Sequence, residues 1–434
     1  MSMSSASNNC PPEILEMAPA SDAEEASQSP SPSKQSNEIP NGGLKAWLQV
    51  LGSFLLFLNT WGVINSFGAF QTYYKDDLLR NVSNSDISWI GSVQACLLLI
   101  VGVATGPLFD AGYFYILLTV GSFLVVFGMF MTSLCTEFWQ VMLAHGITIG
   151  LGSGCLFIPS VAIVSTYFTT KKSFATGIAA SGSSLGGIIY PIVFARLQPR
   201  IGFGWATRVI AFLMLGMMLV CIAVMRVRVL PPQKRRLLEP RAFLEVPFTM
   251  FNLGEFFGFM GLYIPFFYVG SYATSKGGMS TSLAFYMLPI MNAGSVFGRI
   301  IPNFLADKTG PLNMLLPCAL ISALLAYCWI AITDTPGIII YCILYGFFSG
   351  TFVSLPPTTV VSLSPSLQVV GTRMGMSFFF AGLGLLVGTP VAGAILQSHG
   401  WLGTQLFCAC CVVVAGAAMM VARWAKVPTL MAKA

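Results

Sequence analysis

Apolar runs long enough to cross a bilayer recur along almost the whole chain, and they constrain its fold more than any other feature. A membrane-spanning helix needs about 20 consecutive residues that are mostly apolar. Such runs occupy residues 45–70, 87–109, 113–134, 138–167, 173–195, 204–228, 248–272, 281–305, 312–333, 337–361, 372–397 and 401–424. The connections between most of them are short. The sequence therefore predicts an all-α membrane protein with twelve transmembrane helices.

Charge is too scarce for a soluble protein of this length. Only 9% of the 434 residues are charged and 55% are hydrophobic, whereas soluble domains carry about 25% charged residues. The charge is also unevenly placed. Residues 1–40 hold six acidic residues and one lysine, together with ten serines and six prolines, and such a composition cannot bury a core. Residues 1–44 are therefore expected to be a disordered acidic tail.

The distribution of Lys and Arg predicts on which side of the membrane each loop lies. Cytoplasmic loops of membrane proteins carry an excess of these residues. If both termini are cytoplasmic, the inner segments hold fifteen Lys and Arg and the outer segments hold six. This count predicts cytoplasmic termini. It also places the glycosylation sequon at Asn81 outside the cell.

Matching residues in the two halves of the chain predict an internal repeat. Asp110 and Asp307 each close a helix and are 197 residues apart, and Gly177 and Gly375 are 198 residues apart. A nearly constant offset of this kind predicts two parallel six-helix repeats. The predicted parts are an N-terminal half at residues 45–228, a basic cytoplasmic linker at 229–247, and a C-terminal half with a short cytoplasmic tail at 248–434.

Three segments resemble the motifs of a known transporter family. Residues 41–47 (NGGLKAW) are similar to the D-G-G-x-x-x-W motif of fungal monocarboxylate-porter-like transporters, which belong to the major facilitator superfamily. Residues 167–182 (YFTTKKSFATGIAASG) resemble that family's signature at helix 5, and residues 298–307 (GRIIPNFLAD) resemble its helix 8 exit. The resemblance covers residues 41–424. It implies the major facilitator fold, in which two six-helix halves rock around a central substrate site.

The chain departs from animal members of that family where two of their charged residues stand. Asn65 takes the place of the helix 1 lysine that receives the substrate carboxylate, and Ser295 takes the place of an aspartate one turn before Arg299. Arg299 itself is retained. The resemblance therefore implies a small-molecule transporter without implying proton-coupled lactate transport.

Two ionisable residues inside predicted helices are the first candidates for transport chemistry. Such side chains are costly in a membrane and usually face a partner or water. With a rise of about 1.5 Å per residue, Glu255 and Arg299 lie about 10 Å deep on consecutive helices. Arg299 is interpreted as the group that holds an anionic substrate, and Glu255 as a proton-coupling acid; a static salt bridge between them is the alternative. His145, inside helix 4, is a second proton-coupling candidate.

Amide and aromatic side chains complete the predicted substrate site. Amides inside a spanning helix either line a cavity or tie helices together, and aromatic rings either stack on a ligand or fill the core. The predicted substrate-binding residues are Arg299, Asn65, Asn59, Asn292, Tyr263 and Tyr345.

Charged residues at the cytoplasmic helix ends predict a pair of gates. Asp110 and Asp307 occupy equivalent points of the repeat, and helix N-termini favour a nearby carboxylate. Two latches are therefore expected to close the cytoplasmic side, with loop solubility as the alternative explanation. They join Asp110 to the region of Arg373, and Asp307 to the region of Lys171 and Lys172.

These patterns favour a secondary transporter over an enzyme or an ATP-driven pump. The sequence contains no Walker A motif and no catalytic or metal-ligating constellation, so no cofactor, metal or nucleic-acid partner is expected. The expected partners are a small-molecule substrate and the lipid bilayer, with protons added if transport is proton-linked rather than facilitative. We expect a monomer in the cell membrane.

The leading hypothesis for function is efflux of a small anionic or aromatic secondary metabolite. Fungal transporters of the type that the chain resembles often carry organic acids, vitamins or secondary metabolites, and this resemblance motivates the hypothesis. Proton-coupled uptake of a monocarboxylate or related nutrient is the alternative. A transport-inactive nutrient sensor is a third possibility from a different functional class.

Overall fold

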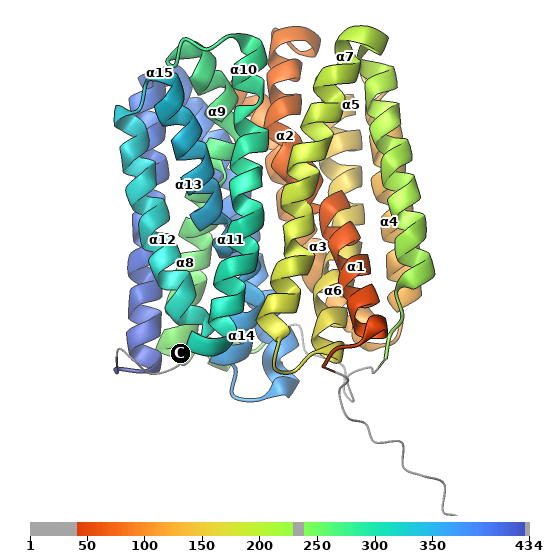
Figure 1. Ribbon diagram of the computed structural model, residues 1–434, viewed down its shortest axis with the longest axis vertical. Coiled ribbons are helices and arrows are strands. Elements are labelled where there is room, and N and C mark those ends of the chain that lie inside the picture. The colour runs from red at the N-terminus through yellow and green to blue at the C-terminus, as the bar shows by residue number, and fades with distance from the viewer. Residues whose placement is uncertain (1–40, 229–237, 430–434) are drawn as a thin grey trace, which may run out of the picture. The chain divides into compact units, whose positions relative to one another are not determined.

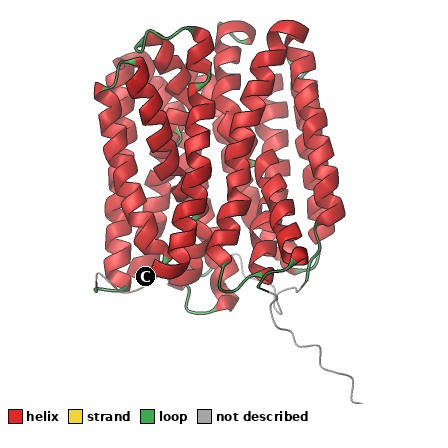
Figure 2. Ribbon diagram, viewed as in Figure 1, coloured by secondary structure: helices red, strands yellow, loops and turns green. Residues whose placement is uncertain are grey.

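The computed structural model describes residues 41–228 and 238–429, and every regular element in these ranges is a helix (Figures 1 and 2). Ten helical stretches there are long and apolar enough to cross a membrane. Two of them, α7 (Lys172–Val224) and α15 (Leu367–Lys426), each contain a glycine with positive φ that joins two helices, Gly202 and Gly400. Counting each of these stretches twice gives the twelve crossings that the sequence predicts.

The N-terminal half begins at Leu44 and ends with α7. Its elements before α7 are α1 (Leu44–Asn59), α2 (Trp61–Tyr73), η1 (Tyr74–Leu78), α3 (Asn84–Asp110), α4 (Phe114–Thr132), α5 (Phe138–Val141), η2 (Met142–Thr148) and α6 (Ile149–Tyr167). The predicted acidic tail lies outside the described residues as far as residue 40.

The C-terminal half ends with α15. Its elements before α15 are η3 (Pro240–Leu244), α8 (Val246–Leu262), α9 (Ile264–Ser275), α10 (Thr281–Phe285), α11 (Met287–Thr309), α12 (Pro311–Cys328), η4 (Trp329–Ala331), α13 (Thr335–Ser354) and α14 (Pro356–Leu363). Residues 229–237 of the predicted linker lie outside the described residues. We call the end of the bundle where α1 begins and α15 ends the near end, and the opposite end the far end (Figure 1).

Several predicted helices are interrupted inside the bundle. The first breaks at Thr60 between α1 and α2, the seventh at Tyr263 between α8 and α9, and the tenth at Leu355 between α13 and α14. Pro265 and Pro356 follow the last two breaks, where proline cannot donate a helical hydrogen bond. Transporters place binding sites at interrupted helices, because the break leaves backbone polar groups available.

Close helix contacts recur at equivalent places in the two halves. In each half, two glycines lie so near the backbone of a neighbouring helix that an added Cβ would overlap a carbonyl oxygen. The contacts pair Gly182 with Phe54, Gly186 with Leu58, Gly384 with Phe256 and Gly388 with Met260. Every residue of the second set is 202 positions after its counterpart, which agrees with two parallel repeats. At this offset Gly177 corresponds to Phe379, so the pairing of Gly177 with Gly375 that the sequence suggests is wrong by about one helical turn.

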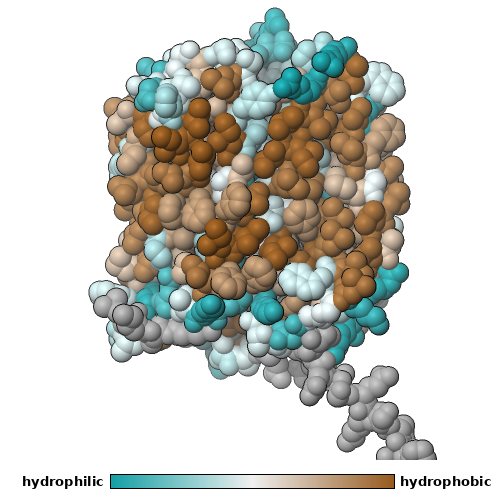
Figure 3. All heavy atoms as spheres, viewed as in Figure 1, coloured by the Kyte–Doolittle hydropathy of each residue, from teal (hydrophilic) through white to brown (hydrophobic). Residues whose placement is uncertain are grey.

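Large apolar side chains cover much of the outer surface. Figure 3 shows a broad hydrophobic belt between more polar rims at the near and far ends. Phe123 of α4, Phe212 of α7 and Leu324 of α12 are each more than half exposed. In water this surface would be costly, whereas in a bilayer it faces lipid. The protein is therefore a multi-pass membrane protein.

Candidate functional site

A cluster of buried polar side chains lies at the boundary between the two halves, next to the helix breaks at Thr60 and Tyr263. Tyr263 donates to Asn65 Oδ1 at 3.2 Å, and Asn65 Nδ2 donates to the carbonyl of Ser183 at 3.2 Å. Ser184 of α7 donates to Ser295 of α11 at 3.1 Å. Because the bonds of Tyr263 to Asn65 and of Ser184 to Ser295 join the two halves, the cluster must rearrange whenever the halves move relative to each other. We call it the central cluster.

Arg299 is the cationic member of the central cluster. Its side chain is 1% exposed. Its Nε donates to Ser295 Oγ at 3.2 Å, and its Nη1 donates across the boundary to the carbonyl of Ala180 at 3.3 Å. The Tyr263 phenol lies beside the guanidinium. No carboxylate among the described residues forms an ion pair with Arg299, so its charge is available to an anion.

The central cluster also contains hydrogen-bonding groups without partners. Asn292 Oδ1 and Trp61 Nε1 are buried, and neither has a partner within the described ranges. The Asn292 amide nitrogen donates to the carbonyls of Leu288 at 3.0 Å and Gly187 at 3.3 Å. The Trp61 ring is stacked on Tyr263, with 6.2 Å between the ring centroids. Rings, a guanidinium and unused polar atoms together suit a flat anionic or aromatic ligand.

The salt bridge between Glu255 and Arg299, which was the alternative to roles in transport, is not formed. Both carboxyl oxygens of Glu255 are buried and have no hydrogen-bond partner among the residues that the structure describes, whereas Arg299 is turned toward Ser295 and Ala180. The prediction placed the two residues at one depth, but depth along a helix does not fix the direction of a side chain around it. The static salt bridge is therefore wrong.

Asn59 and Tyr345, both predicted to bind substrate, instead tie helices together. Asn59 donates to the carbonyl of Leu55 at 2.7 Å and accepts a bond from Tyr190 of α7 at 2.8 Å. Tyr345 donates to the carbonyl of Leu262 at 3.0 Å. These bonds use the polar atoms of both side chains, because a buried polar group must be satisfied where it lies.

His145 lies in an aromatic cage away from Arg299. Its Nδ1 is hydrogen-bonded to the Tyr74 hydroxyl at 2.9 Å, and its ring meets those of Phe67 and Phe70 edge to face. Its Nε2 has no partner in the described part of the chain. Tyr74 and His145 each belong to a π-helical turn, η1 and η2. Such turns are rare and often occur at functional sites.

A ladder of hydroxyl groups, which no motif in the sequence indicates, closes the boundary in the far half of the bundle. Three serines on one face of α3 bond to the other half close to Pro390 of α15. The bonds join Ser85 to the Pro390 carbonyl at 3.0 Å, Ser88 to the Tyr268 hydroxyl at 2.6 Å and Ser92 to the Thr389 hydroxyl at 2.5 Å. The helical spacing of the serines is the signal that could have found them.

At the near end, Asp307 contacts the N-terminus of α7. Its two carboxyl oxygens accept the backbone N–H groups of Ser173 and Phe174, each at 3.0 Å. The sequence analysis expects this carboxylate in the region of Lys171 and Lys172, which is where it lies. The first N–H groups of a helix have no partner within the helix, and they provide the partners here.

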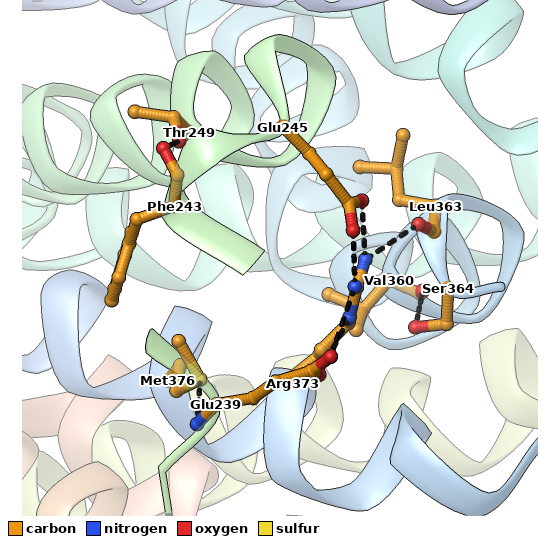
Figure 4. Close-up of polar contacts among 9 residues, drawn as sticks. All are labelled: Glu239, Phe243, Glu245, Thr249, Val360, Leu363, Ser364, Arg373 and Met376. Atoms are coloured by element: carbon orange, nitrogen blue, oxygen red, sulfur yellow. Dashed lines mark hydrogen bonds and ion pairs between the residues drawn. The ribbon is translucent and has the colours of Figure 1, made fainter. Parts of the chain in front are cut away.

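The Arg373 guanidinium is held by two glutamates of its own half (Figure 4). It forms ion pairs with Glu239 at 3.0 Å and Glu245 at 2.5 Å and donates to the Leu363 carbonyl at 3.1 Å. The two glutamates flank η3, which brings both over the start of α15. The predicted latch between Asp110 and the region of Arg373 stays a prediction; Asp110 is buried and is not without a partner.

The ion pairs of Arg373 with Glu239 and Glu245, which we call the clasp, predict an acid-sensitive contribution to stability. The Arg373 guanidinium holds the pKa of Glu245 below its ordinary value of 4.5. A carboxylate with a lowered pKa stabilises the fold above its ordinary pKa, and this contribution is lost as the pH falls through the lowered value. The difference in unfolding temperature between wild type and Glu245→Gln should therefore shrink below pH 4.5. Scanning fluorimetry between about pH 7 and about pH 3 measures it; a constant difference would contradict the clasp.

Known proteins share this architecture. The sequence model of the Major Facilitator Superfamily matches residues 50–371 and 304–434. The chain belongs to the major facilitator superfamily. Among solved structures, this superfamily member resembles the E. coli fucose:proton symporter, with a TM-score of 0.64 and 17% identity over 87% of this chain and 98% of the symporter. At this level of identity the likeness shows the shared fold.

Curated relatives of this superfamily member come from filamentous fungi. An MFS-type transporter of Emericella nidulans is 49% identical over 87% of this chain and 85% of the relative. The aspyridones efflux protein of the same fungus is 40% identical over 89% of this chain and 79% of that protein. The agnestins efflux protein of Paecilomyces divaricatus is 39% identical, covering 87% of each chain. The chain is thus a membrane transporter for small molecules and not an enzyme.

Proposed function

We propose that this transporter exports a small anionic or aromatic secondary metabolite from the cytoplasm by alternating access. The observation that carries the proposal is the buried Arg299 guanidinium, which lies between the halves beside aromatic rings and has no ion-pair partner among the described residues. Two relatives are named as efflux proteins for aspyridones and agnestins. These names support export of a secondary metabolite over uptake of a nutrient.

The proposed substrate site is the central cluster. Arg299 would bind the acidic group of the substrate, and Tyr263 would stack against its ring together with Trp61. Asn65 and Asn292 would provide hydrogen bonds, since both amides already lie at the boundary between the halves. An anion bound there would replace the bonds that Arg299 now makes to Ser295 and Ala180.

The proposed gates are contacts that join the two halves at each end. The near end would close through the contact of Asp307 with the start of α7 and, by the repeat, through a contact of Asp110 with the start of α15. Lys171, Lys172 and Arg373 would lie beside these two contacts. Far-end closure would use the hydroxyl ladder. Both sets of contacts flank the central cluster, so substrate could enter only after the near-end contacts open. It could leave only after the ladder opens.

We further propose that the near end is cytoplasmic and that the chain acts as a monomer in the cell membrane. The excess of Lys and Arg at that end supports this orientation. Asn81 then faces outward on an exposed loop at the far end, where it would be glycosylated.

Contacts between two signature motifs support membership of the monocarboxylate-porter-like family. Asn41 Oδ1 accepts the backbone N–H groups of Thr169 and Thr170, and its Nδ2 donates to the Thr170 hydroxyl. Trp47 meets Phe168 edge to face, with 5.3 Å between the ring centroids. The two segments that resemble this family therefore fold against each other at the near end.

Proton coupling through Glu255 and His145 is part of the proposal and gives a testable prediction. A buried carboxyl group without a cation is stable only with its proton, so Glu255 must meet water to release it. Glu255→Gln, which cannot release a proton, is therefore expected to transport at a rate that no longer depends on external pH. Efflux assays at about pH 5 and about pH 8 measure this dependence, with Glu137→Gln as a surface control. The wild-type pH dependence in Glu255→Gln would contradict coupling through this residue.

Inside-out membrane vesicles test the proposed function and identify the substrate. Vesicles with and without the chain are incubated with a metabolite extract of the organism that encodes the chain. Mass spectrometry then identifies the compounds that accumulate inside the vesicles. We expect an acidic or aromatic compound to accumulate only with the chain. Accumulation of a simple monocarboxylate only in right-side-out vesicles would overturn the proposal in favour of uptake.

A further inference from the structure

A groove of about 370 Å³ runs along the outside of the N-terminal half, between α4 and the last part of α7. Its lining extends from Thr119 to Phe130 on α4 and from Leu215 to Ile222 on α7. All but two of the lining side chains are apolar, and none belongs to the central cluster. Because Phe123 on this wall is more than half exposed, the groove faces lipid when the protein is in a membrane.

The length of the groove is close to that of one leaflet of a bilayer. The span from Thr119 to Phe130 corresponds to about 16 Å at a rise of about 1.5 Å per residue. The hydrocarbon core of a bilayer is about 30 Å thick, so one leaflet occupies about 15 Å. Phe123 is stacked on Phe127 at 5.5 Å between centroids, and Phe130 meets Phe212 of α7 edge to face at 5.0 Å. The groove therefore has a preformed wall of the right length for one acyl chain.

An arginine lies at the near end of this groove. Arg226 follows α7, its side chain is exposed, and its Nη1 donates to the carbonyl of Ile222, a lining residue, at 3.3 Å. Its backbone is held on both sides. The Arg226 N–H donates to Gln49 Oε1 at 2.8 Å, and its carbonyl accepts the Tyr167 hydroxyl at 3.0 Å. These bonds fix the base of the guanidinium at the rim of the groove.

The charge around this rim is positive. The helices α4 and α7 contain no Asp or Glu, and neither do residues 225–228 or the neighbouring helices α1 and α6. Asp110, which ends α3, is buried and has a partner of its own. No carboxylate among the described residues forms an ion pair with Arg226, and Arg228 adds a second positive charge. An exposed guanidinium without a carboxylate favours an anion, and its forked donors suit phosphate.

We propose that this groove binds one anionic phospholipid, with its phosphate on Arg226 and one acyl chain along α4 and α7. Basic pockets between membrane helices bind anionic headgroups in this way. Both helices belong to the N-terminal half, so rocking of the two halves leaves the site intact and the lipid stays bound through the transport cycle. The site is separate from the central cluster and does not depend on the proposed export.

Native mass spectrometry of the purified full chain tests this site with dioleoylphosphatidylglycerol, an anionic lipid. We expect saturable binding of one lipid to wild type. Arg226→Gln should weaken this binding about tenfold, the equivalent of about 1.4 kcal/mol. Arg241→Gln removes an exposed arginine from the C-terminal half, and it should bind as wild type does. Dioleoylphosphatidylcholine has the same acyl chains but no net charge, so wild type should bind it about tenfold more weakly.

Three results would overturn the assignment. These are no saturable binding to a monodisperse wild-type sample, equal affinity of wild type and Arg226→Gln, or equal affinity of wild type for the two lipids. Thr119→Trp is a second check, because it places a large ring in the groove and leaves Arg226 unchanged. It should also weaken binding, and wild-type affinity in this variant would exclude the groove as the place of the acyl chain. The measurement involves no transport, so its outcome is independent of the export proposal and of Arg299.

Discussion

Gly388→Val is expected to destabilise the bundle strongly. Gly388 of α15 lies so close to Met260 of α8 that an added Cβ would overlap a backbone carbonyl oxygen. Backbone cannot turn aside as a flexible side chain can, so the two helices would have to separate. Overpacking a core costs about 1–3 kcal/mol, and a clash with backbone lies at the upper end of that range.

The yield of monodisperse protein and its unfolding temperature measure this effect. Gly216→Val is the matched control, since Gly216 also lies in an apolar helix but an added Cβ there would meet no atom within 4 Å. The control should behave like wild type. Equal stability of the two variants would show that α8 and α15 do not pack as closely as the structure indicates.

Arg299→Gln is expected to leave the fold intact and to abolish export. Glutamine can still hydrogen-bond to Ser295 and Ala180, but it carries no charge for an anionic substrate. Hydrogen bonds to charged groups contribute about 1.5–3 kcal/mol, so substrate affinity should fall about 10- to 100-fold. Arg299→Lys keeps the charge but lacks the forked geometry of guanidinium, and it should show an intermediate loss.

Efflux rates measured at equal amounts of protein in the membrane test this expectation. Arg208→Gln is the control, because Arg208 bonds to Ser133 and lies over the Trp205 ring within the N-terminal half. That variant should export at the wild-type rate. Because the substitution removes an uncompensated buried charge, Arg299→Gln should unfold at a temperature no lower than wild type. Wild-type efflux by Arg299→Gln would exclude Arg299 from substrate binding.

The sequence predicts where the helices of this protein lie better than where they break. Twelve crossings follow from apolar run length alone, because a bilayer admits few other arrangements. The breaks at Thr60 and Tyr263 do not follow, because both residues lie within continuous apolar runs. The sequence also anticipates the region that Asp307 contacts, since helix ends and their charges can be read from the chain.

Side-chain directions and long-range partners could not be predicted. Glu255 and Arg299 have similar depths, yet their directions depend on how α8 and α11 rotate against their neighbours. Arg373 pairs with Glu239 and Glu245 because η3 folds back over α15, which no local pattern indicates. The sequence does predict that Asn65, Asn292, Tyr263 and Arg299 lie inside the bundle, because polar groups inside apolar helices must turn away from lipid.

The partition of metabolites between cells and medium tests the central claim most directly. It is measured by mass spectrometry in the organism that encodes the chain, with the gene intact, deleted, and restored as wild type. Export predicts that one acidic or aromatic secondary metabolite accumulates inside cells that lack the chain, falls in their medium, and returns to its normal distribution on restoration. An unchanged partition of all such metabolites, or a loss of nutrient uptake in its place, would contradict the account.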